Sequence, residues 1–241
     1  MLSNFTRLCL VTFAATLGSR APAMEGGVPA AAGDRLARAT VAVGALIQRI
    51  GGPGLSYCSG VLIRPDLVLT AAHCVRGDPL AATILLYDGS RPVPRGHSAY
   101  AVARHAVPIT EVPSQYASSL RELTLDTAVL RLSVPVRSRS PIRIARSVQQ
   151  IPSVLRVAGV GLSGGAAGTL RTTTVTPLLV TNSGLVVARA NGARLCIGDS
   201  GGPVVGQGRG GPVLFGVLSA VLTSTPPCGE IVVIAPALPD I

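Results

Sequence analysis

The chain has 241 residues, 48% of them hydrophobic and 13% charged, so it can bury a sizeable core. Its formal net charge is +10, and every basic residue is an arginine. This charge predicts a weak attraction to anionic surfaces. The arginines are spread along the chain, however, and aromatic residues make up only 3%. The sequence therefore excludes nucleic-acid binding, which needs clustered positive charge and aromatic rings for stacking.

The first 23 residues have the pattern of a secretory signal peptide. Arg7 supplies a positive start, residues 8–18 an apolar core, and residues 21–23 a cleavage site between small residues. The apolar run is too short to span a bilayer. Cleavage would remove Cys9 and leave four cysteines. We expect a mature chain that starts at residue 24 and is secreted or periplasmic, where disulfides persist.

The remaining residues predict an all-β protein. No long helical period is present, and 28 glycines and 19 prolines separate short apolar runs. This punctuation is typical of many short strands joined by turns. The expected strands lie at 40–47, 60–63, 68–70, 83–87, 127–132, 154–160, 204–205, 213–218 and 231–234.

A serine flanked by glycines is the first indication of chemistry. The segment Cys196–Pro203 reads CIGDSGGP. Glycines let the chain turn tightly and let a substrate approach the backbone closely. Ser200 is therefore a candidate nucleophile for acyl transfer, and the N–H groups of Gly198 and Ser200 are candidates for an oxyanion hole.

A serine hydroxyl needs a base to take its proton, and a third group to orient that base. His73 ends an apolar run beside a cysteine, whereas His97 and His105 lie in mixed stretches and are expected at the surface. Asp126 is a rare acid at the start of a strand-like run. His73 is thus the candidate base and Asp126 the candidate orienting group.

These motifs resemble those of the trypsin/chymotrypsin-like serine proteases. The chain order His73, Asp126, Ser200 separates that family from other lineages that use the same triad. The resemblance extends from about Met24 to the C-terminus. The matching segments are Cys58–Gly60, Thr70–Cys74, Asp126–Leu130, Gly159–Gly161 and Cys196–Pro203.

The resemblance implies a fold of two antiparallel six-stranded β-barrels with the active site in the cleft between them. Residues 24–140 would form the N-terminal barrel, which carries His73 and Asp126. Residues 141–241 would form the C-terminal barrel, which carries Ser200 and the specificity pocket.

Four cysteines allow three disulfide pairings from the sequence alone. The resemblance selects Cys58–Cys74, which would brace the histidine, and Cys196–Cys228, which would brace the nucleophile loop. The cysteine spacing does not fit a zinc site, and we expect no metal and no cofactor.

The resemblance also implies an ion pair at the new N-terminus. The α-amino group of Met24 would insert beside Asp199, because a buried carboxylate is costly without a partner. The family pattern has an apolar residue where this chain has Glu25, so the sequence departs from the pattern here.

The expected specificity pocket differs from that of trypsin. Arg194 occupies the floor position where trypsin has an aspartate, and its charge would repel a substrate Lys or Arg. Leu195 follows it, and the wall segment from Ser219 carries Val221 in place of a glycine. The branched side chains favour a small aliphatic residue before the scissile bond. Two alternatives stay open: Arg194 pairs with a substrate Asp or Glu, or it extends to solvent and selects nothing.

The sequence therefore predicts a secreted serine endopeptidase that hydrolyses peptide bonds through an acyl-enzyme. Its expected partners are peptide or protein substrates and a protein inhibitor, and we expect a monomer. The alternative is a catalytically inert protein of the same fold that uses its positive charge to bind anionic envelope or glycan partners.

Overall fold

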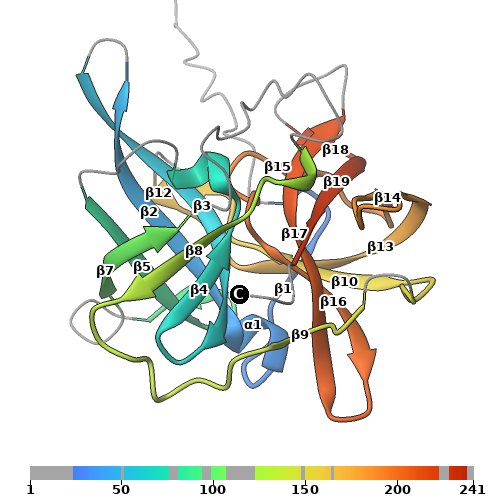
Figure 1. Cartoon of the computed structure of the whole chain (residues 1–241), viewed down its shortest axis with the longest axis horizontal. Helices are drawn as coiled ribbons and strands as arrows, with labels where there is room; N and C mark the ends of the chain where they lie inside the picture. Colours follow the sequence, from blue (N-terminus) through green and yellow to red (C-terminus); the bar gives the residue numbers. More distant parts are fainter. Residues whose placement is uncertain are drawn as a thin grey trace, which may run out of the picture.

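The computed structural model describes residues 24–49, 52–75, 81–93, 99–106, 123–147, 150–163, 166–222 and 228–237. The expected signal peptide lies outside the described residues. Most of the described chain forms strands, gathered into two large sheets that lie next to each other (Figure 1). Helical structure is short within the described ranges: it comprises the α-helix α1 (Arg35–Ala39), the 3-10 turn η1 (Ala72–Val75) and the two helical residues 123–124 before Asp126.

The first sheet closes into a barrel. Its strand order is β2-β3-β4-β8-β7-β5-β6, and β2 also pairs with β5, which joins the ends of a six-stranded ring. All of its pairings are antiparallel. The strands are β2 (Thr40–Arg49), β3 (Gly52–Arg64), β4 (Leu67–Thr70), β5 (Ala81–Asp88), β6 (Arg91–Pro92), β7 (Ala99–Ala106) and β8 (Ala128–Leu132).

The second sheet closes in the same way. Its order is β1-β13-β10-β16-β17-β19-β14, and an additional β13–β14 pairing completes a second six-stranded ring, while β9 lies parallel to β17. The strands are β1 (Val28–Pro29), β9 (Arg143–Ile144), β10 (Leu155–Gly159), β13 (Arg171–Val180), β14 (Val186–Ala190), β16 (Pro203–Gly208), β17 (Gly211–Leu222) and β19 (Ile231–Pro236). The prediction of two antiparallel six-stranded barrels is confirmed.

Two short ribbons complete the strands. β11 (Leu162–Ser163) pairs with β12 (Ala166–Ala167), and β15 (Leu195–Cys196) pairs with β18 (Cys228–Gly229). The second ribbon matters for the site because β15 leads directly into the serine loop. Of the helices in the part of the chain described, none is long and apolar enough to cross a membrane.

Buried side chains of the described residues form three apolar clusters. One fills the first barrel, and another fills the second. The third draws residues from both sheets and from α1, so it forms an apolar contact between the barrels. Each Å² of apolar surface buried here stabilises the folded state by roughly 25 cal/mol, so this contact stabilises the arrangement of the two barrels. Its large members include Leu36, Leu69, Tyr87, Val205 and Leu214.

The described strands extend the expected ones at several ends, and three strands of five residues or more, as well as the two-residue strands, were not predicted. β7 contains an arginine and a histidine, while β13 has three threonines after its first residue and contains Pro177. β14 alternates buried and more exposed positions over only five residues. These segments lack the continuous apolar run on which the sequence prediction depended. The division of the chain at residue 140 stays a prediction, and β1 pairs with the second sheet although it precedes the first.

Candidate active site

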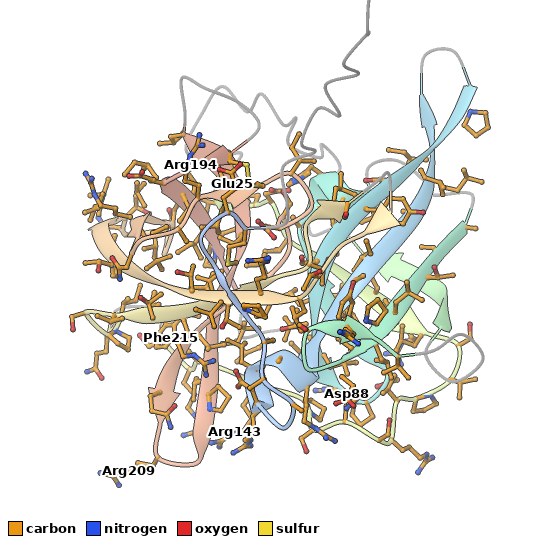
Figure 2. All side chains as sticks on the ribbon, turned by 180° about the vertical axis from the view of Figure 1, so that it is seen from behind. Glu25, Asp88, Arg143, Arg194, Arg209 and Phe215 are labelled. Atoms are coloured by element: carbon orange, nitrogen blue, oxygen red, sulfur yellow. A yellow bond between two sulfur atoms is a disulfide. The ribbon has the colours of Figure 1, made fainter. Side chains whose placement is uncertain are left out.

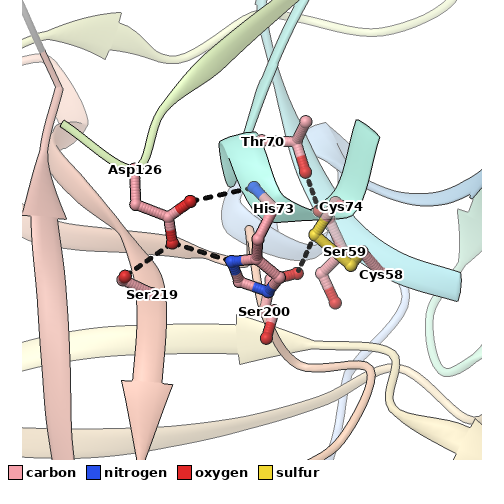
Figure 3. Close-up of polar contacts among 8 residues, drawn as sticks. All are labelled: Cys58, Ser59, Thr70, His73, Cys74, Asp126, Ser200 and Ser219. Atoms are coloured by element: carbon pink, nitrogen blue, oxygen red, sulfur yellow. Dashed lines mark hydrogen bonds and ion pairs between the residues drawn. A yellow bond between two sulfur atoms is a disulfide. The ribbon is translucent and has the colours of Figure 1, made fainter. Parts of the chain in front are cut away.

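A hydrogen-bonded histidine–aspartate pair lies on the first barrel. His73 is in η1, directly after β4, and Asp126 lies just before β8; β4 and β8 pair so that Thr70 faces Ala128. This pairing brings the two side chains together. Nδ1 of His73 lies 2.7 Å from Oδ2 of Asp126, and the His73 backbone N–H donates to Oδ1 at 2.9 Å (Figure 3).

Asp126 is held from a third side by the second barrel. The Ser219 hydroxyl, on β17, donates to Oδ2 of Asp126 at 2.6 Å, and the aspartate is only 2% exposed. Because a carboxylate accepts hydrogen bonds, Nδ1 of a neutral His73 is the protonated nitrogen. The other ring nitrogen, Nε2, is then left with a lone pair that can accept a proton.

The serine loop connects β15 to β16. Gly198 and Gly201 have positive φ angles of 93° and 79°, in the region that favours glycine. A Cβ on Gly201 would collide with the Ser59 carbonyl and the Thr70 side chain, so the loop packs directly against the first barrel. The tight turns thus place Ser200 against the barrel that carries His73.

Ser59 fastens this loop, a role that the sequence analysis did not assign. Its backbone N–H donates to the Ser200 carbonyl at 2.8 Å, and its hydroxyl donates to the Gly198 carbonyl at 2.8 Å. The Val160 N–H in turn donates to the Ser59 hydroxyl at 2.9 Å. Ser59 lies in the segment Cys58–Gly60, which resembles the family, so its position was visible in the sequence although its contacts were not.

Both predicted disulfides are present. Cys58–Cys74 joins β3 to η1, and Cys196–Cys228 joins β15 to β18. The Ser200 carbonyl lies 3.9 Å from the sulfur of Cys74, the residue after the histidine. A ring nitrogen of His73 lies within 4.8 Å of the sulfurs of the first disulfide. The disulfide is therefore close to both the histidine turn and the serine loop. In the view of Figure 3, the His73 ring lies between Asp126 and Ser200.

Two groups among the described residues have the composition of a metal site. Cys58 and Cys74 lie near His73, and Cys196 and Cys228 lie near Glu25. All four sulfurs belong to disulfides, whereas cysteine binds metals as a thiolate. Neither group therefore has the donor chemistry of a zinc site. The two disulfides fit an extracellular protein.

Asp199 is buried beside Met24. The Met24 backbone N–H donates to Oδ2 of Asp199 at 3.2 Å, and the Cys196 N–H donates to the same oxygen at 2.8 Å. Asp199 is 1% exposed and Met24 is fully buried. Burial raises the pKa of Asp199 to about 7, although these N–H groups and the positive charge of Arg171 act in the opposite direction.

The expected pocket residues have different surroundings. Leu195 is buried in the core of the second barrel, and Val221 packs against that core. The Ser219 side chain is directed to Asp126. The Arg194 guanidinium forms an ion pair with Glu25, with 3.0 Å between Nη1 and Oε2, and donates to the Cys228 carbonyl at 2.8 Å. The charge of Arg194 is therefore paired with a carboxylate of the same chain.

The expectation for His97 and for the His105 side chain falls outside what the structure describes. Among the other predicted residues, the structure brings together His73, Asp126 and Ser219, and it separately brings Met24 to Asp199. Ser200 belongs to the loop that Ser59 fastens to the first barrel.

Two closed β-barrels with a histidine–aspartate pair on one and a glycine-flanked serine on the other define a two-barrel protein of the trypsin type. The structure is similar to a solved structure titled "HL collagenase", with a TM-score of 0.67, 21% identity and coverage of 88% of this chain and 93% of that one. This likeness concerns the fold alone.

The family model described as Trypsin matches residues 26–236, and the chain belongs to the trypsin-like serine protease family. It is 33% identical over 199 residues to serine protease 56 of Homo sapiens. This alignment covers 71% of this chain but only 31% of that protein. It is 27% identical over 177 residues to snake venom serine protease BthaTL of Bothrops alternatus, covering 65% of this chain and 72% of the relative. Brachyurin of Leptuca pugilator is 29% identical over 165 residues, and the alignment covers 61% of this chain and 70% of the relative.

Proposed function

We propose that this chain is a secreted or periplasmic serine endopeptidase. The observation that carries the proposal is the 2.7 Å contact between Nδ1 of His73 and Asp126, which directs the basic nitrogen of the ring away from the aspartate. In the proposed reaction Nε2 of His73 takes the proton of Ser200 as its hydroxyl attacks the substrate carbonyl. Asp126 orients the ring and stabilises the imidazolium that forms.

The oxyanion formed in this step would be met by the backbone N–H groups of Gly198 and Ser200. The positive φ of Gly198 supports this role, because it gives the peptide units before and after Gly198 an orientation that would be strained for a residue with a side chain. The imidazolium then gives its proton to the leaving amine, and a peptidyl ester remains on Ser200. Water, activated by the same histidine, hydrolyses the ester and restores the serine.

We propose a small aliphatic residue before the scissile bond. Val221 packs over the core of the second barrel in the segment expected to form the pocket wall, which leaves less room than a glycine would. The ion pair between Arg194 and Glu25 weighs against the alternative of an acidic residue, because the positive charge already has a partner. A Lys or Arg at this substrate position would meet the Arg194 charge.

The proposed mature enzyme starts at Met24. Cleavage after residue 23 would replace the Met24 amide, 3.2 Å from Asp199, with an α-ammonium group, which is a stronger partner for a buried carboxylate. We propose that residues 24–140 and 141–241 act as the two halves of a monomer that binds peptide or protein substrates, and that a protein inhibitor can occupy the same cleft.

A second candidate is an inert protein of this fold that binds anionic envelope or glycan partners. The formal charge of +10 favours it. The two candidates differ in whether the chain cleaves peptides. A peptide-library digest with the chain starting at Met24, beside a Ser200→Ala variant, separates them. Cleavage that the variant loses supports the endopeptidase, and equal absence of cleavage in both proteins supports the binding protein.

A further inference from the structure

Glu25 and Arg194 are joined through both their backbones and their side chains. The Arg194 N–H donates to the Glu25 carbonyl at 2.8 Å, within an isolated antiparallel bridge between the two residues. Their side chains form the ion pair at 3.0 Å, and Figure 2 labels both residues at the same edge of the second barrel. The bridge fixes the two Cα atoms opposite each other, so the pair is a built feature and not a chance contact between long side chains.

The guanidinium is also held from a second direction. Its Nη2 donates to the carbonyl of Cys228, in the strand that pairs with β15 immediately after Arg194. Two directional partners, a carboxylate and a carbonyl, match the planar fork of an arginine side chain. The side chains of Arg194 and Glu25 are 37% and 33% exposed, so the pair is partly accessible to water.

We propose that Glu25 is a specificity-determining residue: its carboxylate is an internal countercharge that occupies Arg194 and excludes acidic substrate side chains from the pocket floor. This inference rests on the proposed function, in which Arg194 lies at that floor. A substrate Glu or Asp would have to displace Glu25 or lie beside a like charge, and either costs binding energy. An uncharged side chain has no such cost.

The proposal explains why the second residue of the expected mature chain is charged. An apolar residue at position 25 would remove the carboxylate that meets the Arg194 guanidinium. Glu25 directly follows Met24, whose N–H is bonded to Asp199, so the same buried segment places the countercharge. The N-terminal segment therefore supplies a group that sets substrate preference.

The test compares two peptide substrates that differ only by Glu or Gln before the scissile bond. The ratio of their kcat/KM values is measured within each enzyme variant, so the ratio is independent of how much of the preparation is active. Glu25→Gln should raise the Glu/Gln ratio about fivefold, the size expected for a partly exposed charge pair. Asp88→Asn removes an exposed carboxylate from the end of β5, on the other barrel, and should leave the ratio unchanged (Figure 2).

The reciprocal variant gives a second, independent readout. Arg194→Gln leaves the Glu25 carboxylate uncompensated, so the Lys/Gln ratio should rise and the Glu/Gln ratio should not. The double variant should return both ratios toward those of the wild type. If the wild type cleaves the Gln peptide but Glu25→Gln leaves the Glu/Gln ratio unchanged, the countercharge proposal is overturned while the proposed function stands. If the wild type cleaves no peptide, both fail together.

Discussion

Retention of a single residue before Met24 should make the stability of the protein strongly dependent on pH. In a chain that keeps Ala23, position 24 offers Asp199 only an amide N–H, and burial raises the pKa of Asp199 to about 7 from an ordinary value of 3.8. A carboxyl whose folded pKa is raised favours the folded state when it is protonated. Its penalty is therefore absent below about pH 4, grows as the pH rises and is complete above pH 7.

The magnitude follows from the shift in the pKa. A difference of about three pKa units corresponds to about 4 kcal/mol of unfolding free energy lost between pH 4 and pH 8. In the chain that starts at Met24, the α-ammonium group stabilises the carboxylate and lowers the pKa of Asp199, so most of this loss should disappear. Urea denaturation at both pH values, on chains with and without Ala23, measures the difference.

Asp199→Asn in the chain that keeps Ala23 is the matched control, since it removes the titrating group. It should abolish the extra pH dependence. Equal pH dependence in the two chains, or a dependence that survives Asp199→Asn, would refute the assignment of Asp199 as the group that the N-terminus stabilises.

Three further predictions concern the site. Asp126→Asn should lower kcat by about 10⁴-fold with little change in KM, because an amide can hold His73 in the wrong tautomer. An unchanged kcat with a raised KM would contradict an orienting role. Ser59→Ala should cost about 2 kcal/mol of stability in urea denaturation, because the Gly198 carbonyl and the Val160 N–H lose the hydroxyl that they bond, and an unchanged midpoint would argue against the role of Ser59 in fastening the serine loop. Replacing both Cys58 and Cys74 by alanine should cost about 3 kcal/mol; activity per folded molecule should fall as well if the disulfide positions the histidine turn.

The double-barrel fold could be predicted because a few local motifs identify it. The segment Cys196–Pro203 combines a candidate nucleophile, two glycines with positive φ and a disulfide cysteine, and such a combination has few other uses. The strands with continuous apolar runs were also predictable. β13 was missed because its threonines and Pro177 do not show the expected apolar run, and it is held instead by partners on both sides, β10 and β14. Its threonines and valines favour a strand locally, so the signal was present but lay in β-branched residues rather than in an apolar run.

The contacts between distant positions were less accessible. Glu25 was recognised as a departure from the family pattern, and Arg194 as an unusual floor residue, yet nothing in the local sequence linked two positions 169 residues apart. The role of Ser59 was inaccessible for the same reason, because its partner Gly198 lies 139 positions away in the sequence. Long-range side-chain pairs of this kind follow from strand register and loop packing, which short motifs do not encode.

The central claim is that His73, Asp126 and the serine loop form an assembled catalytic site. The most direct test is labelling of the chain that starts at Met24 with a fluorophosphonate probe, followed by mass spectrometry to locate the adduct. The account predicts one phosphonate per molecule, on Ser200, and loss of labelling in Ser200→Ala and in His73→Ala. A folded protein that starts at Met24 and takes up no label, or takes it up at another residue, would contradict the account.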